Sequence, residues 1–289
     1  MWNKGFKGWY FKHQRGADTI ALIPGQAESG AFVQLLCPEG ARQFPVESLA
    51  VRGGVIHADS CRFSLRGCRI DLPGVGGVLH YGRITPLASD IMGPFAHLPM
   101  QCRHGVLSMG HTLCGSLTVD GVPHCFDQGR GYIEMDSGTS FPRFYLWLHC
   151  NDFPIPLSVM LSIAHIPFGG AAFTGCICAI LLGGREYRLA TYRGVRIQAP
   201  GPQVIRLSQG GLLLELEVQP TQVGHPLAAP VRGQMSGTIR ESVNAALHLR
   251  LWERGRLVCD QYSPHATYEF VPEPPGQSRG LAVESNGLL

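Results

Sequence analysis

The sequence predicts an all-β protein built from antiparallel hairpins, and three observations support that prediction. Only 16% of the 289 residues are charged, whereas glycine (37 residues) and proline (21 residues) are abundant. Short runs of β-branched and aromatic residues recur between these turn formers, which is typical of a turn-rich sheet protein. Helical periodicity is almost absent, because the best helix candidate, residues 239–249, fits a strand nearly as well.

The first elements are expected to form a meander of short strands. Apolar and aromatic residues favour strands at 6–13, 19–23 and 31–36, with Pro24-Gly25 and a polar stretch at 26–30 between the last two.

A hairpin is expected around Asp120-Gly121, which interrupts two alternating segments within residues 117–126. A tight primed turn requires positive φ at both central residues, and Asp-Gly meets that requirement.

Three more hairpin turns are expected in the second half of the chain. They are Gly183-Gly184 between 176–182 and 185–192, Gly210-Gly211 between 204–207 and 212–218, and Arg254-Gly255 between 246–252 and 257–262. Residues 268–271 are expected to add a closing strand.

Strands this numerous must bury one face and protect their edges, and closure into a barrel removes edges altogether. At roughly 100–200 residues per domain, the chain length fits two such units. We therefore expect tandem antiparallel β-barrels or sandwiches, with an N-terminal β-domain over residues 1–130 and a C-terminal β-domain over 131–272. Residues 273–289 lack periodic apolar positions and are expected to form a flexible tail.

Charge and targeting signals exclude several classes of function. The net charge of +3 is spread over single Arg and Lys residues, so no nucleic-acid partner is expected. The N-terminus lacks the pattern of a secretory signal, and no apolar run approaches about 18 residues. These features predict a cytoplasmic protein.

The ten cysteines are expected to be mostly buried thiols, since the chain is long and shows no export signal. Cys176 and Cys178 share a strand face, and Cys150 follows His149. No Cys-x-x-Cys pair or spaced His pair accompanies them, so no metal site is predicted.

The most informative segment is 131–151, which places two acids in apolar, aromatic surroundings. In an extended strand Tyr132, Glu134 and Asp136 share one face, while Ile133 and Met135 face the other way. Burial would raise the pKa of one carboxyl, and a second carboxylate on the same face would raise it further. Alternatively, either acid could cap a turn around Gly138.

Several motifs carry a resemblance to a known family. Gly131-Tyr-Ile-Glu-Met-Asp-Ser-Gly138, Ser140-Phe-Pro142, Trp147-Leu-His-Cys-Asn151 and Gly8-Trp-Tyr-Phe-Lys12 resemble the tocopherol cyclase family. The block from Met92 to His111 is similar to the compact bacterial members. The resemblance covers about residues 8–197. The chain departs from the family at Met135, where Lys is usual, and at Ser137, where Trp is usual. These departures indicate a different substrate or an inactive site.

The resemblance implies two lipocalin-like β-barrels and acid-catalysed cyclisation of a prenylated quinol to a chromanol ring. Such a reaction needs an acid that protonates an alkene, and a dry pocket that holds the isoprenoid chain folded. It requires no organic cofactor.

The candidate catalytic residues are Glu134 and Asp136. The candidate substrate-binding residues are Trp9, His104, His111, Tyr132, Phe141, Trp147 and Asn151. His104 and His111 are an odd number of residues apart, so in a regular strand they face opposite ways, and either can be purely structural. Tyr10 is expected to be a packing residue, on the face opposite Trp9 and Phe11.

Two functions from different classes remain open at this point. The first is a cyclase that acts on a prenylated quinol or related isoprenoid. The second is a lipocalin-like carrier of an apolar small molecule, since an eight-stranded barrel can hold one small ligand. A transient contact with a membrane surface would supply such a ligand, and the sequence does not fix the oligomeric state. Acids that point into a deep apolar cavity would favour the enzyme.

Overall fold

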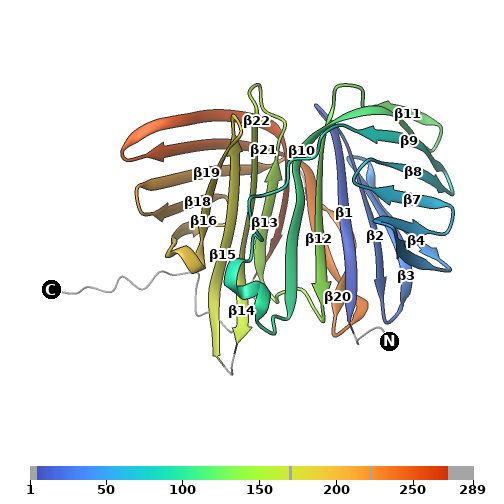
Figure 1. Cartoon of the computed structure of the whole chain (residues 1–289), viewed down its shortest axis with the longest axis horizontal. Helices are drawn as coiled ribbons and strands as arrows, with labels where there is room; N and C mark the ends of the chain where they lie inside the picture. Colours follow the sequence, from blue (N-terminus) through green and yellow to red (C-terminus); the bar gives the residue numbers. More distant parts are fainter. Residues whose placement is uncertain (1–4, 169–170, 222, 273–289) are drawn as a thin grey trace.

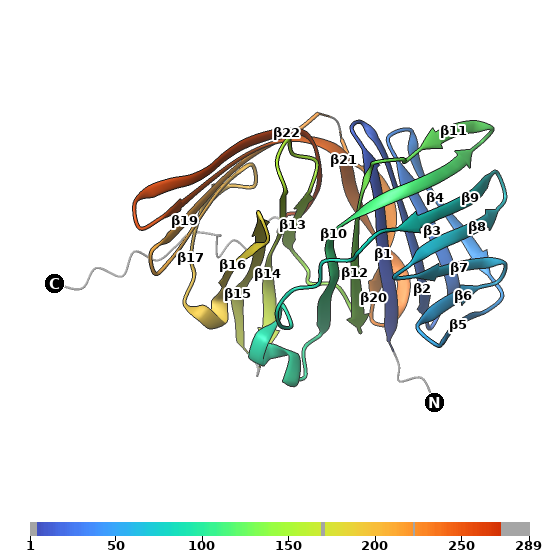
Figure 2. The same cartoon turned by 45° about the horizontal axis from the view of Figure 1, so that its top comes forward.

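The structure, a computed structural model, describes residues 5–168, 171–221 and 223–272 and confirms the all-β prediction. These residues form 22 strands and two short 3₁₀ helices, η1 (Gly93–His97) and η2 (Thr191–Arg193), and contain no α-helix. The strands make two antiparallel sheets that lie side by side (Figures 1 and 2). The predicted tail at 273–289 lies outside the described residues.

The first sheet contains twelve strands from the N-terminal half. They are β1 (Phe6–Arg15), β2 (Asp18–Ala27), β3 (Gly30–Cys37), β4 (Gly40–Val46), β5 (Leu49–Arg52), β6 (Val55–Ala58), β7 (Cys61–Ser64), β8 (Gly67–Leu72), β9 (Val75–Tyr81), β10 (Cys102–Val119), β11 (Val122–Cys125) and β12 (Arg130–Gly138). Their order is β4-β3-β2-β1-β12-β10-β9-β8-β7-β6-β5, with β11 paired to β10. The sheet folds over on itself, because its core joins Val33 and Leu35 near one edge to Ile56 and Phe63 near the other.

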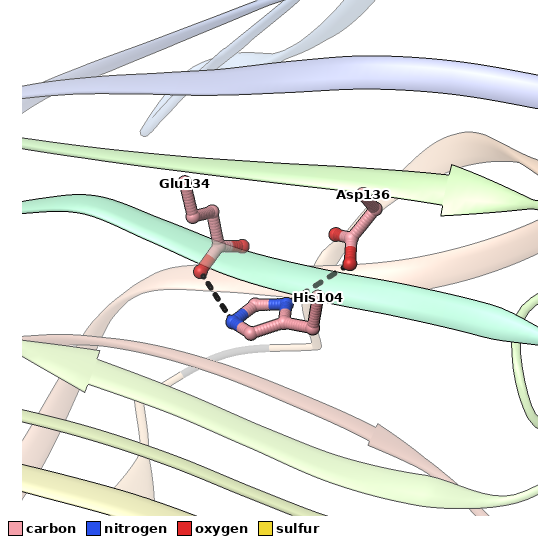
Figure 3. Close-up of side chains that lie close together, drawn as sticks. All are labelled: His104, Glu134 and Asp136. Carbon is pink, nitrogen blue, oxygen red and sulfur yellow. Dashed lines mark hydrogen bonds and ion pairs between the residues drawn. The ribbon is translucent and has the colours of Figure 1, made fainter. Parts of the chain in front are cut away.

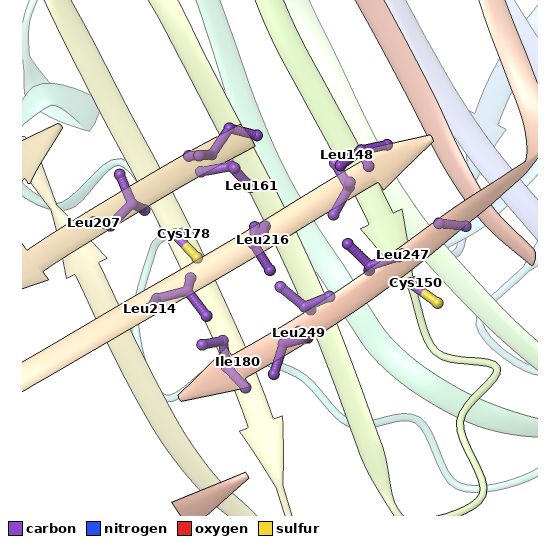
Figure 4. Packing of buried hydrophobic residues seen from close by; sticks show 14 of the residues in the cluster. Leu148, Cys150, Leu161, Cys178, Ile180, Leu207, Leu214, Leu216, Leu247 and Leu249 are labelled. Atoms are coloured by element: carbon purple, nitrogen blue, oxygen red, sulfur yellow. The ribbon is translucent and has the colours of Figure 1, made fainter. Parts of the chain in front are cut away.

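The second sheet contains ten strands. They are β13 (Tyr145–Cys150), β14 (Leu157–Phe168), β15 (Ala171–Leu182), β16 (Arg185–Ala190), β17 (Arg196–Gly201), β18 (Val204–Gln209), β19 (Leu212–Pro220), β20 (His225–Val231), β21 (Gln234–Glu253) and β22 (Arg256–Val271). Their order is β16-β15-β14-β13-β22-β21-β19-β18-β17, with β20 paired to β21. Figure 4 shows its core, where leucines of β19 and β21 pack against Leu161, Cys178 and Ile180.

The predicted turns lie between paired strands. Asp120-Gly121 joins β10 to β11 with φ values of 49° and 83°, as a primed turn requires. Gly183-Gly184, Gly210-Gly211 and Arg254-Gly255 join β15 to β16, β18 to β19 and β21 to β22. Residues 239–249, the best helix candidate, belong to strand β21.

The break predicted at Pro24-Gly25 is wrong, because β2 continues through both residues. Pro24 pairs with Val33 of β3, but the pairing of β2 with β1 skips Pro24. Proline has no backbone N–H to donate, so it is tolerated where the ladder to one neighbour is interrupted.

The sheets divide between Gly138, which ends β12, and Tyr145, which begins β13. The division into separate domains at residues 130 and 131 stays a prediction.

Two segments reach over from one sheet and contact the other. Residues 82–101, here called the strap, leave the first sheet and contact β16 and η2 of the second. Residues 225–240, here called the arm, comprise β20 and the start of β21, and they reach the first sheet, beside which β20 is drawn in orange in Figure 1. The Gln34 side chain of β3 exchanges two hydrogen bonds with the backbone of Ala228, at 2.8 and 3.1 Å.

Arg188 of β16 holds the strap in place. Its buried guanidinium donates to the carbonyl oxygens of Ser89 and Asp90 at 3.0 and 2.7 Å, and it forms an ion pair with Glu186 at 2.6 Å. Glu186 in turn accepts the backbone N–H of Ala88 at 2.8 Å. One buried arginine therefore ties an exposed part of the strap to the second sheet through two backbone carbonyls.

Replacing Gly121 with Val tests the hairpin. No atom lies near the position that a Cβ would occupy, so the cost arises from the positive φ alone. We expect a loss of roughly 1 kcal/mol or more in the free energy of unfolding, measured by urea denaturation. Gly121→Asn, which tolerates this conformation, should lose less. Equal stability of the Val variant and the wild type would contradict the turn assignment.

Replacing Arg188 with Ala tests the anchor of the strap. We expect a loss of about 3 kcal/mol in the free energy of unfolding, because the ion pair of a buried arginine is broken and the strap loses the donor that holds it. Hydrogen exchange of amides in residues 86–98 should accelerate.

Arg185→Ala in the same strand is the matched control, since Arg185 forms a more exposed ion pair with Glu253 and its removal should cost much less stability than the removal of Arg188. Similar losses in the two variants would show that Arg188 is not a specific anchor.

Candidate active site

An apolar cavity lies between the two sheets and takes its walls from both. Strands β1, β10 and β12 contribute from the first sheet, and β13, β14, β15, β21 and β22 from the second. The strap and the arm complete it with residues such as Met92, Phe95, Leu227 and Ile239. Its free volume is about 190 Å³. A cavity of roughly 150 Å³ can bind benzene, so this cavity is large enough to hold the reacting part of a substituted aromatic ring.

Strand β12 places its two acids toward this cavity. Glu134 and Asp136 line the cavity, whereas Ile133 and Met135 pack in the core of the first sheet. The predicted alternation of faces is confirmed. The side chains of both acids bond to other side chains from within a strand, so the alternative in which they cap a turn is wrong.

His104 of β10 lies between the two carboxylates (Figure 3). Its Nδ1 is 2.9 Å from Asp136 Oδ1, and its Nε2 is 3.5 Å from Glu134 Oε2. This geometry follows from the register, because His104 is the direct Cα partner of Asp136 across the β10–β12 pair.

The cluster shifts the pKa values of its members. Burial raises the pKa of Glu134 to about 7; the imidazolium of His104 opposes this shift and the carboxylate of Asp136 adds to it. Burial alone would lower the pKa of His104, but the charges of Asp136 and Glu134 more than offset it and raise that pKa to about 9. Near neutral pH, His104 is therefore a cation beside a carboxyl that is poised to give or take a proton.

Two aromatic residues fix the Glu134 carboxyl. Its Oε2 accepts the Tyr132 hydroxyl at 2.5 Å and the Trp147 indole N–H at 3.3 Å. Its Oε1 has no hydrogen-bond partner among the described residues. The protonated carboxyl can thus carry its hydrogen on Oε1, on the side of the group that the aromatics leave free.

The structure brings together six of the nine residues singled out from the sequence. These cavity residues are Trp9, His104, Glu134, Asp136, Phe141 and Trp147. Trp9 is shared with the core of the first sheet, where it lies near Phe11 and Ile133.

The other three lie outside the cavity wall. Tyr132 supports Glu134 from behind, where it stacks on His149 with ring centroids 3.7 Å apart. His111 is on the opposite face of β10, bonded to Ser108 and 4.6 Å from the Tyr81 ring. Asn151 donates to the carbonyl oxygen of Gly131 at 3.0 Å, which holds β12 in place. Their substrate-binding roles stay predictions that the observed positions do not favour.

The sequence did not single out two tyrosines and two acids that also line the cavity: Tyr10, Tyr145, Glu241 and Glu269. Tyr10 does more than pack, because its hydroxyl donates to Glu241 at 2.5 Å. The sequence did contain a signal for Glu269. It is a lone acid between Tyr268 and Phe270 in the expected closing strand, just as Glu134 is a lone acid between apolar neighbours in β12. Glu241 gave no comparable signal.

The cluster is compact enough for a cation, since the ligand atoms of His104, Glu134 and Asp136 lie within 4.8 Å of one another. The two carboxylates raise the pKa of His104 to about 9, so a metal would have to displace a proton from its ring to bind there. We therefore treat the trio as an acid–base group.

Sequence comparison points to one family. The "Probable tocopherol cyclase, chloroplastic" of Oryza sativa subsp. japonica is 23% identical over 213 residues, which covers 68% of this chain. The chloroplastic tocopherol cyclase of Zea mays matches with the same identity and coverage. The resemblance to tocopherol cyclases is confirmed. The chain spans about half the length of these relatives, since the matches cover 45% of each. No protein-family model matches the chain.

Solved structures share the fold. The crystal structure of CghA with Sch210972 aligns with a TM-score of 0.60 at 11% identity, covering 92% of this chain and 88% of that one. Kievitone hydratase from Nectria haematococca aligns with a TM-score of 0.51 at 13% identity, covering 91% and 88%. The predicted tandem of lipocalin-like β-units is confirmed by these matches. Within the described ranges, no helix has the length and apolar character needed to cross a membrane.

The acid cluster should make stability fall as pH rises. The folded-state pKa of Glu134 is raised from 4.5 to about 7, so the native state binds more protons than the unfolded state between those values. Its favourable contribution is complete below the unfolded pKa and is lost as pH rises through about 7. His104, Glu241 and Glu269 shift in the same direction, and Asp136 is also close to Glu134.

We expect Glu134→Gln to flatten the dependence of unfolding free energy on pH between 5 and 7, by up to about 1.4 kcal/mol per pH unit. Urea denaturation across this range measures it. Glu47→Gln, an exposed glutamate, should follow the wild type. Parallel curves for the wild type and Glu134→Gln would show that Glu134 ionises normally.

Proposed function

We propose that this protein is a cyclase that protonates the side-chain alkene of a prenylated quinol or related isoprenoid and closes a chromanol-type ring. The observation that carries the proposal is a buried carboxyl, Glu134, which faces an apolar cavity with its pKa raised to about 7. The similarity to tocopherol cyclases supports a cyclase-like function, and the hydratase among the structures of similar fold is compatible with alkene protonation.

Glu134 is the proton donor in this proposal. Its neutral carboxyl gives the Oε1 proton to the less substituted alkene carbon, which leaves a tertiary cation. The rings of Trp147 and Tyr10, 5.6 Å apart, lie at the same cavity and can stabilise that cation, by about 2 kcal/mol in a desolvated site. The apolar walls exclude water, so the substrate's own hydroxyl captures the cation.

His104 and Asp136 position and tune the donor. The imidazolium stabilises the Glu134 carboxylate that remains after proton transfer, and Asp136 orients the imidazole through its 2.9 Å contact with Nδ1. After the proton transfer, the Glu134 carboxylate is therefore paired with His104 and is not an unpaired buried charge.

The two departures from the family motif lie away from this chemistry. Met135 packs in the core of the first sheet, and Ser137 pairs across the ladders with Lys7 and Arg103. Neither belongs to the cavity wall. A tryptophan at position 137 would lie on the face of β12 that points away from the cavity, whereas Trp147 lies at the cavity in this chain. The departures therefore do not argue for an inactive site.

The carrier alternative predicts binding without turnover. In a carrier, Glu134 and Asp136 are expected to face solvent or to accept hydrogen bonds from the backbone amides of a turn. Both instead line the cavity, which supports the enzyme.

Anaerobic incubation of the purified protein with a prenylated benzoquinol, followed by chromatography for the chromanol, tests the proposal. We expect product from the wild type and from Glu47→Gln, and a rate at least about 100-fold lower from Glu134→Gln, as general-acid catalysis implies. The wild-type rate should decline as pH rises through about 7, where Glu134 loses its proton.

Binding without product in the wild type would favour the carrier. A Glu134→Gln rate equal to that of the wild type would remove Glu134 as the donor. Either result would overturn the cyclase as stated here.

A further inference from the structure

A second pair of buried acids faces the cavity from the second sheet. Glu241 of β21 and Glu269 of β22 are direct Cα partners in the antiparallel ladder, and only 3% and 6% of their surfaces are exposed. Each accepts a tyrosine hydroxyl, Glu241 from Tyr10 at 2.5 Å and Glu269 from Tyr145. The two acids thus repeat the tyrosine–glutamate contact that Glu134 makes with Tyr132.

Neither acid forms an ion pair with any residue that the structure describes. No lysine or arginine is among the residues that line the cavity, and His104 is engaged by Asp136 and Glu134. The buried Lys12 contacts His149 at 3.4 Å, and its charge also acts on Glu241, where it partly opposes the effect of burial on the pKa of that acid. Like charges directly opposite each other in a sheet are destabilising, and buried unpaired charges more so. As two carboxylates, the pair would therefore cost stability in its buried position.

The electrostatics of the site keep this pair largely protonated. Burial raises the pKa of Glu241 to about 8, and burial together with the charge of Glu241 raises the pKa of Glu269 well above its usual value. Two facing carboxyls that share protons can both donate and accept hydrogen bonds, which suits a hydroxyl group.

We propose that Glu241 and Glu269 bind the phenolic hydroxyl of the ligand and accept its proton during ring closure, across the cavity from Glu134. This inference rests on the proposed cyclisation and narrows its substrate class. A pure hydrocarbon isoprenoid would offer these acids no hydrogen bond beyond those from Tyr10 and Tyr145, whereas a hydroxylated aromatic ring would add one. The favoured ligand is a phenol or quinol that carries an unsaturated chain.

The step balances without an oxidant or a cofactor. The O–H bond of Glu134 breaks as a C–H bond forms at the alkene, and the phenol oxygen forms a C–O bond to the resulting tertiary carbon. The phenolic O–H bond then breaks, and its proton passes to the Glu241–Glu269 pair in the form in which one of the two carboxyls is ionised, which is the minor form below a pH of about 8. After the product leaves, this pair releases one proton to water and Glu134 takes one up.

Equilibrium binding separates this inference from the cyclase proposal. The probes are a prenylated hydroquinone and its dimethyl ether, and the readout is quenching of tryptophan fluorescence, since Trp147 lies at the cavity. We expect the wild type to prefer the free hydroquinone by at least tenfold, because a site built to bond a hydroxyl rejects an analogue that lacks it. Glu241→Leu and Glu269→Leu should lose that preference, while Glu134→Gln and Glu47→Gln should keep it.

The conservative variant Glu241→Gln provides a second test in case the leucine variants fail to fold. It keeps the shape of the side chain and the acceptor for Tyr10 but cannot take up a proton. We expect it to bind the free hydroquinone within a fewfold of wild-type affinity and to turn it over at least about tenfold more slowly.

The outcomes are distinct. An unchanged preference in the folded leucine variants, or full turnover in Glu241→Gln, overturns the inference and leaves the role of Glu134 intact. Loss of the preference in a protein that never forms product supports the binding site and removes the cyclase.

Discussion

Burial of carboxyl groups without a matching set of cations is the constraint on which the cavity depends. Glu134, Asp136, Glu241 and Glu269 line one space, and His104 is the single basic side chain among the residues that line it. Water cannot solvate these groups fully, so protonation is the least costly way to remove charge. Carboxyl groups in the cavity therefore stay protonated near neutral pH. A reaction that begins with protonation of an alkene needs such an acid.

The two-sheet architecture creates this environment. Neither sheet alone encloses the space: the first contributes Glu134 and its partners, and the second contributes Trp147, Tyr145 and the second acid pair. The strap and the arm then cross in opposite directions, anchored by Arg188 and by Gln34. Each half thus covers part of the other, and the polar groups that hold these crossings lie outside the acid cluster.

Local chemistry made much of the fold predictable. Asp120-Gly121 and the other turn pairs specify hairpins through their own φ preferences, and the period of two along β12 separates Glu134 from Ile133. What the sequence could not supply was pairing between distant segments. His104 meets Asp136 only because β10 and β12 pair in one register, and Glu241 meets Glu269 only across the β21–β22 hairpin. Spacing along the chain does not encode these contacts.

Two bulges leave the facing of the β10 histidines unchanged. β10 shifts register against β12 between Val106 and Ser108 and again before His111, and each shift adds one residue to β10. Because the two shifts together amount to two residues, His111 keeps the face opposite His104 that its odd spacing predicts; it covers Gly131 on the core side, and burial lowers its pKa to about 4. A motif that spans both histidines therefore mixes a cavity residue with a core residue.

The placement of acids on two different sheets has a stereochemical consequence. Glu134 approaches the cavity from β12, whereas Glu241 and Glu269 approach from the paired strands of the other sheet. With the roles proposed above, a prenylated ring bound through its oxygen to the second sheet would present a single face of its double bond to the acid of the first. Ring closure in such a cavity would create the new quaternary carbon in one configuration, so the handedness of the product would depend on which sheet carries which carboxyl.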